Sequence, residues 1–136
     1  MIVDTSALVA VFRREDGFGP ILNAMLTERA KMPTPAFVEF GRVTAMEGNT
    51  PHPQALALLS QLTAGDFQLE PFTAADADLT MAANERYGTG NGRGGPLNML
   101  DLMVYGMAKR LDEPLLCTGR DFLSTDVAVH PASRRW

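Results

Sequence analysis

The sequence has a single cysteine, Cys117, and only two histidines, and no apolar run approaches the length of a membrane span. One cysteine excludes an internal disulfide, and without a nearby histidine it makes neither a zinc site nor an activated thiol, so we expect Cys117 in the core. A membrane span needs about 18 consecutive apolar residues, and a basic start followed by an apolar stretch and a cleavage site is missing as well. We therefore expect a cytoplasmic protein with no membrane segment.

Positive charge is scarce too, because 12 lysines and arginines face 16 aspartates and glutamates, for a net charge of −4. This balance is unusual for a protein that binds nucleic acid through a basic surface. If four carboxylates formed one metal site, they would account for the whole excess, and the rest of the surface would have room for basic patches. The 136 residues, 46% hydrophobic and 21% charged, are typical of one globular domain, which we place over 1–136.

What the chain does contain is a regular alternation of strand-like and helix-like segments. Short apolar runs predict strands over 1–4, 31–34, 67–72, 114–118 and 127–130. Apolar residues at helical spacing predict helices over 5–13, 19–30, 35–47, 51–64, 73–87 and 98–111. Thr34 before Pro35 resembles a helix N-cap, and Thr73 with Asp76 resembles a capping box. The alternation predicts an α/β fold with a mostly parallel β-sheet flanked by α-helices, whose functional residues lie at the carboxyl ends of the strands.

Four acidic residues follow expected strand ends or lie in the first turns of expected helices: Asp4, Glu39, Asp101 and Asp121. In a parallel sheet these side chains would converge on one edge. Their like charges would repel one another unless a cation neutralised them. Oxygen ligands without histidine or cysteine suit Mg²⁺ or Mn²⁺ better than zinc. The sequence therefore predicts an acidic metal site at this edge of the sheet.

Each acid also has an ordinary local interpretation. Asp4 could cap the helix that follows it, and Asp101 could lie at the third position of a helix capped by Asn98. Glu39 could form an ion pair with the arginine one turn further on, and Asp121 could cap its own turn. Two observations favour the metal site: Asp101 stands in strongly apolar surroundings, and four acids in equivalent places are less expected by chance than one.

Weaker candidates surround this set. Residues whose hydroxyls could orient a ligand or a water molecule, or could simply make local hydrogen bonds, are Thr5, Ser6 and Thr118. Residues that could contact phosphates, or could be solvated surface charges, are Arg42, Arg93 and Arg120. The isolated histidines, which we expect at the surface, are His52 and His130. The glycine-rich loop over 88–96 follows no strand, so it does not match a nucleotide-binding cradle.

Several of these segments resemble the motifs of PIN-domain ribonucleases, specifically the VapC toxins of type II toxin–antitoxin systems. The opening MIVDTSALVAVF resembles their first strand and helix, and TPAFVEFGRV resembles their second motif, with its acid at Glu39. The stretch LNMLDLMVYGMAKRLDEPLLCTGRDFLSTDV is similar to their third and fourth motifs, which carry the Leu-Asn pair at 97–98 and the acids at Asp101 and Asp121. The resemblance spans nearly the whole chain.

The resemblance implies a PIN-like fold and a Mg²⁺- or Mn²⁺-dependent endoribonuclease that arrests translation by cutting a structured RNA of the tRNA or rRNA type. It implies that Asp4 and Asp101 are the firmest metal ligands, that Glu39 and Asp121 complete the site partly through metal-bound waters, and that Asn98 supports it. It also implies a homodimer and a cognate VapB-type antitoxin that lays its C-terminal segment across the active site. No histidine, lysine or tyrosine base is needed, because an ion held by carboxylates acidifies a bound water.

One departure from the family pattern keeps an alternative open. Family members often have Asp or Asn where this chain has Arg120, and an arginine beside Asp121 lowers the local negative charge and puts a second metal ion in question. A catalytically weakened PIN domain that only binds RNA or a protein is therefore the alternative function. A phosphotransfer domain with a phosphorylated Asp4 is a further rival, but the paired acid and the lysine that such domains need are missing.

Overall fold

Four parallel strands form the centre of the fold. The computed structural model describes residues 1–134, and its strands are β1 (Ile2–Val3), β2 (Ala30–Pro33), β3 (Phe67–Glu70) and β4 (Leu115–Leu116). They lie in the order β3–β2–β1–β4. Ile2 pairs with Lys31 of β2 on one side and with Leu115 of β4 on the other. The predicted α/β class with a parallel sheet is confirmed.

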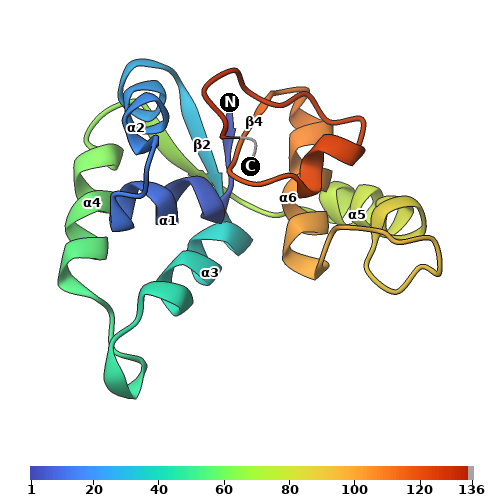
Figure 1. Cartoon of the computed structure of the whole chain (residues 1–136), viewed down its shortest axis with the longest axis horizontal. Coiled ribbons are helices and arrows are strands. Elements are labelled where there is room, and N and C mark those ends of the chain that lie inside the picture. The colour runs from blue at the N-terminus through green and yellow to red at the C-terminus, as the bar shows by residue number, and fades with distance from the viewer. Residues whose placement is uncertain (135–136) are drawn as a thin grey trace.

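Six α-helices within the described residues connect and cover these strands: α1 (Thr5–Arg13), α2 (Phe18–Thr27), α3 (Thr34–Thr44), α4 (Pro53–Thr63), α5 (Ala74–Tyr87) and α6 (Met99–Leu111). Two short 3₁₀ helices are η1 (Glu47–Asn49) and η2 (Asp121–Ser124). Figure 1 shows α1, α2 and α4 on one side of the strands and α5 with α6 on the other, and α3 packs against both α1 and α6. No helix in the part of the chain that the structure describes combines the length and the hydropathy needed to cross a bilayer.

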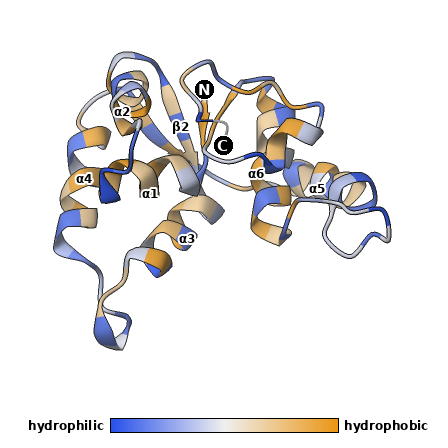
Figure 2. Ribbon diagram, in the orientation of Figure 1, coloured by the Kyte–Doolittle hydropathy of each residue, from blue (hydrophilic) through white to orange (hydrophobic). Residues whose placement is uncertain are grey.

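Strands β1 and β4 are buried on both faces, as expected when helices cover a parallel sheet. Both residues of β1 and both residues of β4 are fully inaccessible to solvent. In Figure 2 these two strands are orange, whereas the loop between α5 and α6 and the turn after α3 are mostly pale or blue. Burial of this apolar surface is the main driving force that holds the carboxyl ends of the strands in place.

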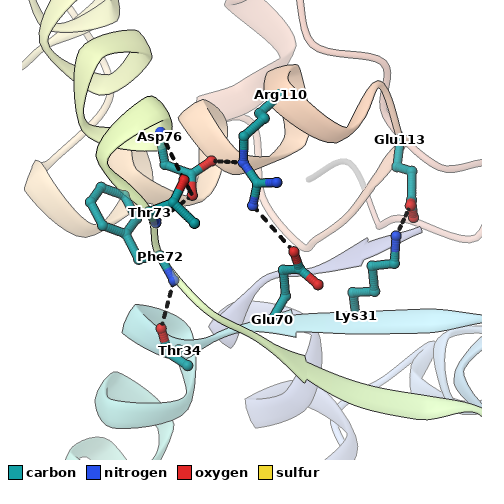
Figure 3. A network of polar contacts seen from close by, with 8 residues as sticks. All are labelled: Lys31, Thr34, Glu70, Phe72, Thr73, Asp76, Arg110 and Glu113. Carbon is teal, nitrogen blue, oxygen red and sulfur yellow. Dashed lines mark hydrogen bonds and ion pairs between the residues drawn. The ribbon is translucent and has the colours of Figure 1, made fainter.

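The start and end of α3 differ from the prediction. The helix begins at Thr34 with Pro33 as its N-cap residue, so the predicted cap at Thr34 is wrong. The Thr34 hydroxyl instead accepts a hydrogen bond from the backbone N–H of Phe72 at 3.1 Å, which ties α3 to the segment after β3 (Figure 3). The helix ends at Thr44 rather than at Gly48, because Ala45 already has an extended backbone with ψ at 145°.

The predicted last strand, over 127–130, is shorter than expected. It makes one isolated parallel bridge, between Leu115 and Val129. The backbone N–H of Leu115 donates to the carbonyl of Ala128 at 2.8 Å, and the N–H of His130 donates to the carbonyl of Leu115 at 2.8 Å. The segment therefore lies beside β4 at the edge of the sheet but pairs with it over one residue only.

The histidines are more involved in packing than the sequence suggested. His130 is only 8% exposed, so its predicted surface position is wrong. Its Nε2 lies 3.1 Å from Glu28 Oε2, and its Nδ1 accepts from the N–H of Ala132 at 3.1 Å. His52 is half-buried, accepts from the N–H of Gln54 as the N-cap of α4, and contacts the Phe12 ring edge-on. Both histidines hold local structure.

Candidate active site

Asp4 lies at the carboxyl end of β1, in the middle of the sheet. It is 5% exposed and is the N-cap residue of α1. Its carboxylate accepts from the N–H of Ser6 at 2.9 Å and also from the Ser6 hydroxyl. Its own N–H donates to the carbonyl of Leu116 in β4 at 3.0 Å. The strand register and the cap therefore hold a buried carboxylate at the N-terminus of α1, where the helix dipole favours negative charge.

Asp101 occupies the third position of α6 and completes a capping box with Asn98. The N–H of Asp101 donates to Asn98 Oδ1 at 3.0 Å, and Asp101 Oδ2 accepts from the N–H of Asn98 at 3.0 Å. The local interpretations of Asp4 and Asp101 as capping residues are thus confirmed. Capping fixes the direction of each carboxylate and leaves its charge in place, so it is compatible with a second role for both acids.

The charges of the other three predicted acids act on Asp101, and the charge of Glu39 acts on Asp4. Burial raises the pKa of Asp101 from 3.8 to about 7, and the charges of Asp4, Asp121 and Glu39 add to this effect. Burial also raises the pKa of Asp4; the charge of Glu39 adds to it, while the hydrogen bonds from Ser6 oppose it. The structure therefore brings Asp4, Glu39, Asp101 and Asp121 into one electrostatic environment at the carboxyl edge of the sheet.

The ion pairs of the described residues leave this charge without a cationic partner. None of the ion pairs among residues 1–134 includes one of the four acids. The alternative pairing of Glu39 with Arg42 is accordingly not formed. A carboxylate that is buried without a cationic partner is costly, so the site has an excess of negative charge that a bound cation would relieve.

The donor set fits a hydrated Mg²⁺ or Mn²⁺ ion rather than a fully caged one. Within residues 1–134, no three His, Cys, Asp or Glu side chains are arranged closely enough to hold a metal ion together. Mg²⁺ keeps several of its water ligands and is commonly held by one or two carboxylates plus a substrate phosphate. Asp4 and Asp101, the two acids that their caps orient, could hold such an ion, and the charges of Glu39 and Asp121 act on Asp101 as well.

Ser6 connects the ends of two strands at this site. Its hydroxyl donates to Asp4 and accepts from the N–H of Thr118 at 3.0 Å, just beyond β4. Thr118 therefore contributes its backbone, whereas the Thr5 hydroxyl donates to the carbonyl of Ala36 at 3.2 Å and ties α1 to α3. Of the three predicted hydroxyl residues, Ser6 is the one whose side chain contacts an acid of the site.

The three predicted arginines differ in their surroundings. Arg93 donates to the carbonyl of Glu85 at 2.7 Å, which folds the glycine-rich loop back onto the C-terminal end of α5. Arg42 is exposed and lines a groove that Glu39 also lines. Arg120 is exposed and directly precedes η2. Arg42 and Arg120 therefore lie nearest to the acidic site along the chain, and Arg93 is engaged elsewhere.

Two apolar grooves flank α3, and Glu39 lines one of them. One, of about 600 Å³, lies between α3 and α4, and the other, of about 680 Å³, lies between α3 and α6. Exposed apolar side chains line the second groove, with Val38 at 68% exposure and Met99 at 72%. Exposed apolar surface of this kind is typical of a protein–protein contact.

Sequence reasoning missed Asp126 as a residue of interest. It follows η2 and accepts hydrogen bonds from Tyr105 at 2.5 Å, from Tyr87 at 3.4 Å and from Lys109 at 3.3 Å. These partners lie 17 to 39 residues away along the chain, so no local pattern could reveal them.

The chain is similar in sequence to known proteins. The family model described as PIN domain matches residues 1–128. Ribonuclease VapC28 of Mycobacterium tuberculosis is 34% identical over 128 residues, which cover 93% of this chain and 95% of that protein. Ribonuclease VapC30 of the same organism is 36% identical over 130 residues, which cover 95% of this chain and 97% of that protein.

Solved structures share the fold at lower sequence identity. A toxin–antitoxin complex from Klebsiella pneumoniae contains a chain with a TM-score of 0.71 and 18% identity, with 96% of each chain covered. VapC20 of Mycobacterium tuberculosis, described as a sarcin–ricin loop cleaving toxin, has a TM-score of 0.69 and 18% identity, with 96% of this chain and 98% of that one covered.

Proposed function

The chain belongs to the VapC ribonucleases of the PIN-domain family, and on that premise we propose that it is a Mg²⁺- or Mn²⁺-dependent endoribonuclease. It acts in the cytoplasm as the toxin of a VapBC-type toxin–antitoxin pair and cuts a structured RNA of the tRNA or rRNA type. The observation that carries the metal requirement is Asp101, whose pKa is raised to about 7 by burial and by three neighbouring acids. A divalent cation is the group that this uncompensated charge would favour.

The residues of the chain have distinct tasks in this reaction. Asp4 and Asp101 would hold the ion, and Ser6 orients Asp4 by donating to its carboxylate. A bound Mg²⁺ or Mn²⁺ neutralises phosphate charge and makes water a better nucleophile. Glu39 and Asp121 accept or direct the proton that the attacking water loses. Because water attacks, the 2′-hydroxyl of the RNA takes no part, and the products carry a 5′-phosphate and a 3′-hydroxyl.

Exposed residues around the acids recognise the RNA and the partner proteins. Arg42 and Arg120 are exposed near the acids and contact phosphates, while Arg93 presents the glycine-rich loop. Both apolar grooves border α3, the helix that carries Glu39. They support two partners that would bind beside the acids: a cognate VapB-type antitoxin and a second copy of the chain. A toxin–antitoxin complex among the structures of the same fold supports the antitoxin as a partner.

The Asp101→Asn variant tests this function. We expect it to lose RNA cleavage completely while it still folds and binds the antitoxin, because the amide keeps the size of the carboxylate but not its charge. With the wild-type protein, EDTA should abolish cleavage and added Mg²⁺ or Mn²⁺ should restore it. Cleavage by Asp101→Asn at the wild-type rate would contradict the site. A wild-type chain that binds the antitoxin and RNA but cuts no RNA would favour the weakened PIN domain.

A further inference from the structure

Asp126 joins three segments of the chain that are distant in sequence. Its carboxylate accepts from the hydroxyls of Tyr105 in α6 and Tyr87 at the end of α5, and from the ammonium of Lys109 in α6. The two tyrosine rings lie 5.5 Å apart, so the aromatic pair presents both hydroxyls to one carboxylate. We refer to Asp126 with Tyr87, Tyr105 and Lys109 as the Asp126 cluster.

Two residues of the cluster closely follow acids of the active site along the chain. Tyr105 follows Asp101 by one helical turn in α6, and Asp126 follows Asp121 by five residues just beyond η2. The bond from Tyr105 to Asp126, at 2.5 Å, therefore fastens the segment that carries Asp121 to the helix that carries Asp101. A short connection of this kind limits how far one carboxylate can move relative to the other.

The segment between Asp121 and Asp126 has few other attachments. Phe122 is 4% exposed and Val127 is 8% exposed, so apolar packing holds both of its ends. Between them, the hydroxyl and the N–H of Thr125 both donate to the carbonyl of Phe122, within the segment itself. The Asp126 cluster thus links this turn to α6 through polar contacts.

The protonation states of the pair suit a lasting charge-assisted hydrogen bond. The bond from Tyr105 lowers the pKa of Asp126, so Asp126 stays ionised. Burial and the adjacent carboxylate raise the pKa of the Tyr105 hydroxyl, so it stays a neutral donor. Bonds between a neutral donor and an ionised acceptor are stronger than neutral pairs.

We infer that Asp126 is a positioning residue: through Tyr105 and Lys109 it holds the Asp121 turn against α6 and so sets the place of the Asp121 carboxylate relative to Asp101. This inference rests on the proposed function, because it assigns a metal-dependent purpose to the position of Asp121. Asp126 itself acts through the turn and has no contact with the reacting atoms.

The Asp126→Asn variant tests the inference on the metal-free and Mn²⁺-loaded protein without RNA. Backbone amide exchange over 121–127 should become faster, while exchange in the sheet stays unchanged. The Mn²⁺ affinity, measured by electron paramagnetic resonance, should fall about 10-fold, within the range observed when a residue that supports a metal ligand is changed. Tyr105→Phe, which keeps the buried ring and removes the hydroxyl, should have the same effects, and Asp126→Glu should restore part of the affinity.

The matched control is Asp66→Asn, which removes the same charge from an exposed pair, Asp66 with Arg29 at 3.6 Å, and should leave both readouts at wild-type values. Unchanged exchange over 121–127 in both cluster variants would overturn the inference, as would faster exchange with an unchanged Mn²⁺ affinity. A wild-type protein that binds no Mn²⁺ would instead overturn the proposed metal site. The two failures are therefore distinguishable.

Discussion

Two aspartates hold the same position in two neighbouring helices, and their pKa values are shifted in opposite directions. Asp76 in α5 and Asp101 in α6 each lie at the third helical position and each complete a capping box, with Thr73 and Asn98 as the respective N-cap residues. The pKa of Asp101 is raised to about 7. The pKa of Asp76 is lowered, even though its side chain is fully buried.

The difference comes from their partners. Burial alone would raise the pKa of Asp76, but hydrogen bonds from Arg110 and Thr73 outweigh it. Arg110 donates to Asp76 at 2.5 Å and to Glu70 at 3.2 Å, so one guanidinium joins α6, α5 and β3 in the network of Figure 3. The charged neighbours of Asp101 are other acids, whereas the charged neighbour of Asp76 is an arginine. A charge that the fold compensates stabilises structure, and a charge that it leaves uncompensated indicates a site for a ligand.

The largest expected effect on stability belongs to Asp76. We expect Asp76→Asn to lower the free energy of unfolding by about 3 kcal/mol, because it removes one partner of a buried ion pair and weakens the capping box. Chemical denaturation measures this loss directly. The control, Asp66→Asn, should cost less than about 0.5 kcal/mol because its ion pair is exposed. Equal losses in the two variants would mean that the network around Arg110 contributes no more than a surface pair.

The pH dependence of stability should separate Asp101 from Asp76. The folded protein keeps the Asp101 proton up to a pKa of about 7, whereas the unfolded chain loses it near 3.8, so stability falls as the pH rises through this window. After allowance for partial solvent screening, we expect Asp101 to account for a loss of about 1 to 2 kcal/mol between about pH 5 and about pH 8 in EDTA. The pKa of Asp76 is lowered, so its contribution changes only in more acidic solution.

Asp101→Asn provides the comparison for this measurement. The variant has no proton to lose at this position, so its unfolding free energy should fall less over the same pH range. Added Mg²⁺ should raise the stability of the wild-type protein at the upper end of the range more than that of the variant, because the ion binds the ionised form. Identical pH slopes for the two proteins would show that Asp101 is not the group that titrates.

Most of the fold follows from local features of the sequence. The capping box of Thr73 with Asp76 and the helix over 73–87 were predicted within one residue of α5, because apolar spacing and capping are properties of neighbouring residues. Thr34 shows the limit of this reasoning. Its pattern is that of a cap, yet its hydroxyl accepts from Phe72, 38 residues away, and a partner at that distance is set by how α3 packs on the sheet.

The site shows the same division between local and distant information. That these four acids share one electrostatic environment could be predicted, since each follows a strand or lies in the first turns of a helix. The position of Ser6 between Asp4 and Thr118 could not, because its second partner is 112 residues away. The pairing of His130 with Glu28 escaped prediction for the same reason, at a separation of 102 residues. Side chains that connect distant segments become visible only in the folded chain.

The smallest expected effect concerns Arg120, which places a positive charge beside the uncompensated acids. Arg120→Asn should tighten Mn²⁺ binding about two- to fivefold at low salt, because it removes a positive charge that weakens the attraction between these acids and the metal ion. Arg120 is exposed, so ions screen its charge, and the difference should shrink toward zero at high ionic strength. The matched control is Arg13→Asn, at the far end of the helix that Asp4 caps. If both variants changed the affinity equally, net charge rather than the place of Arg120 would be responsible. If the effect of Arg120→Asn persisted in high salt, the Arg120 side chain would have to contact the site directly.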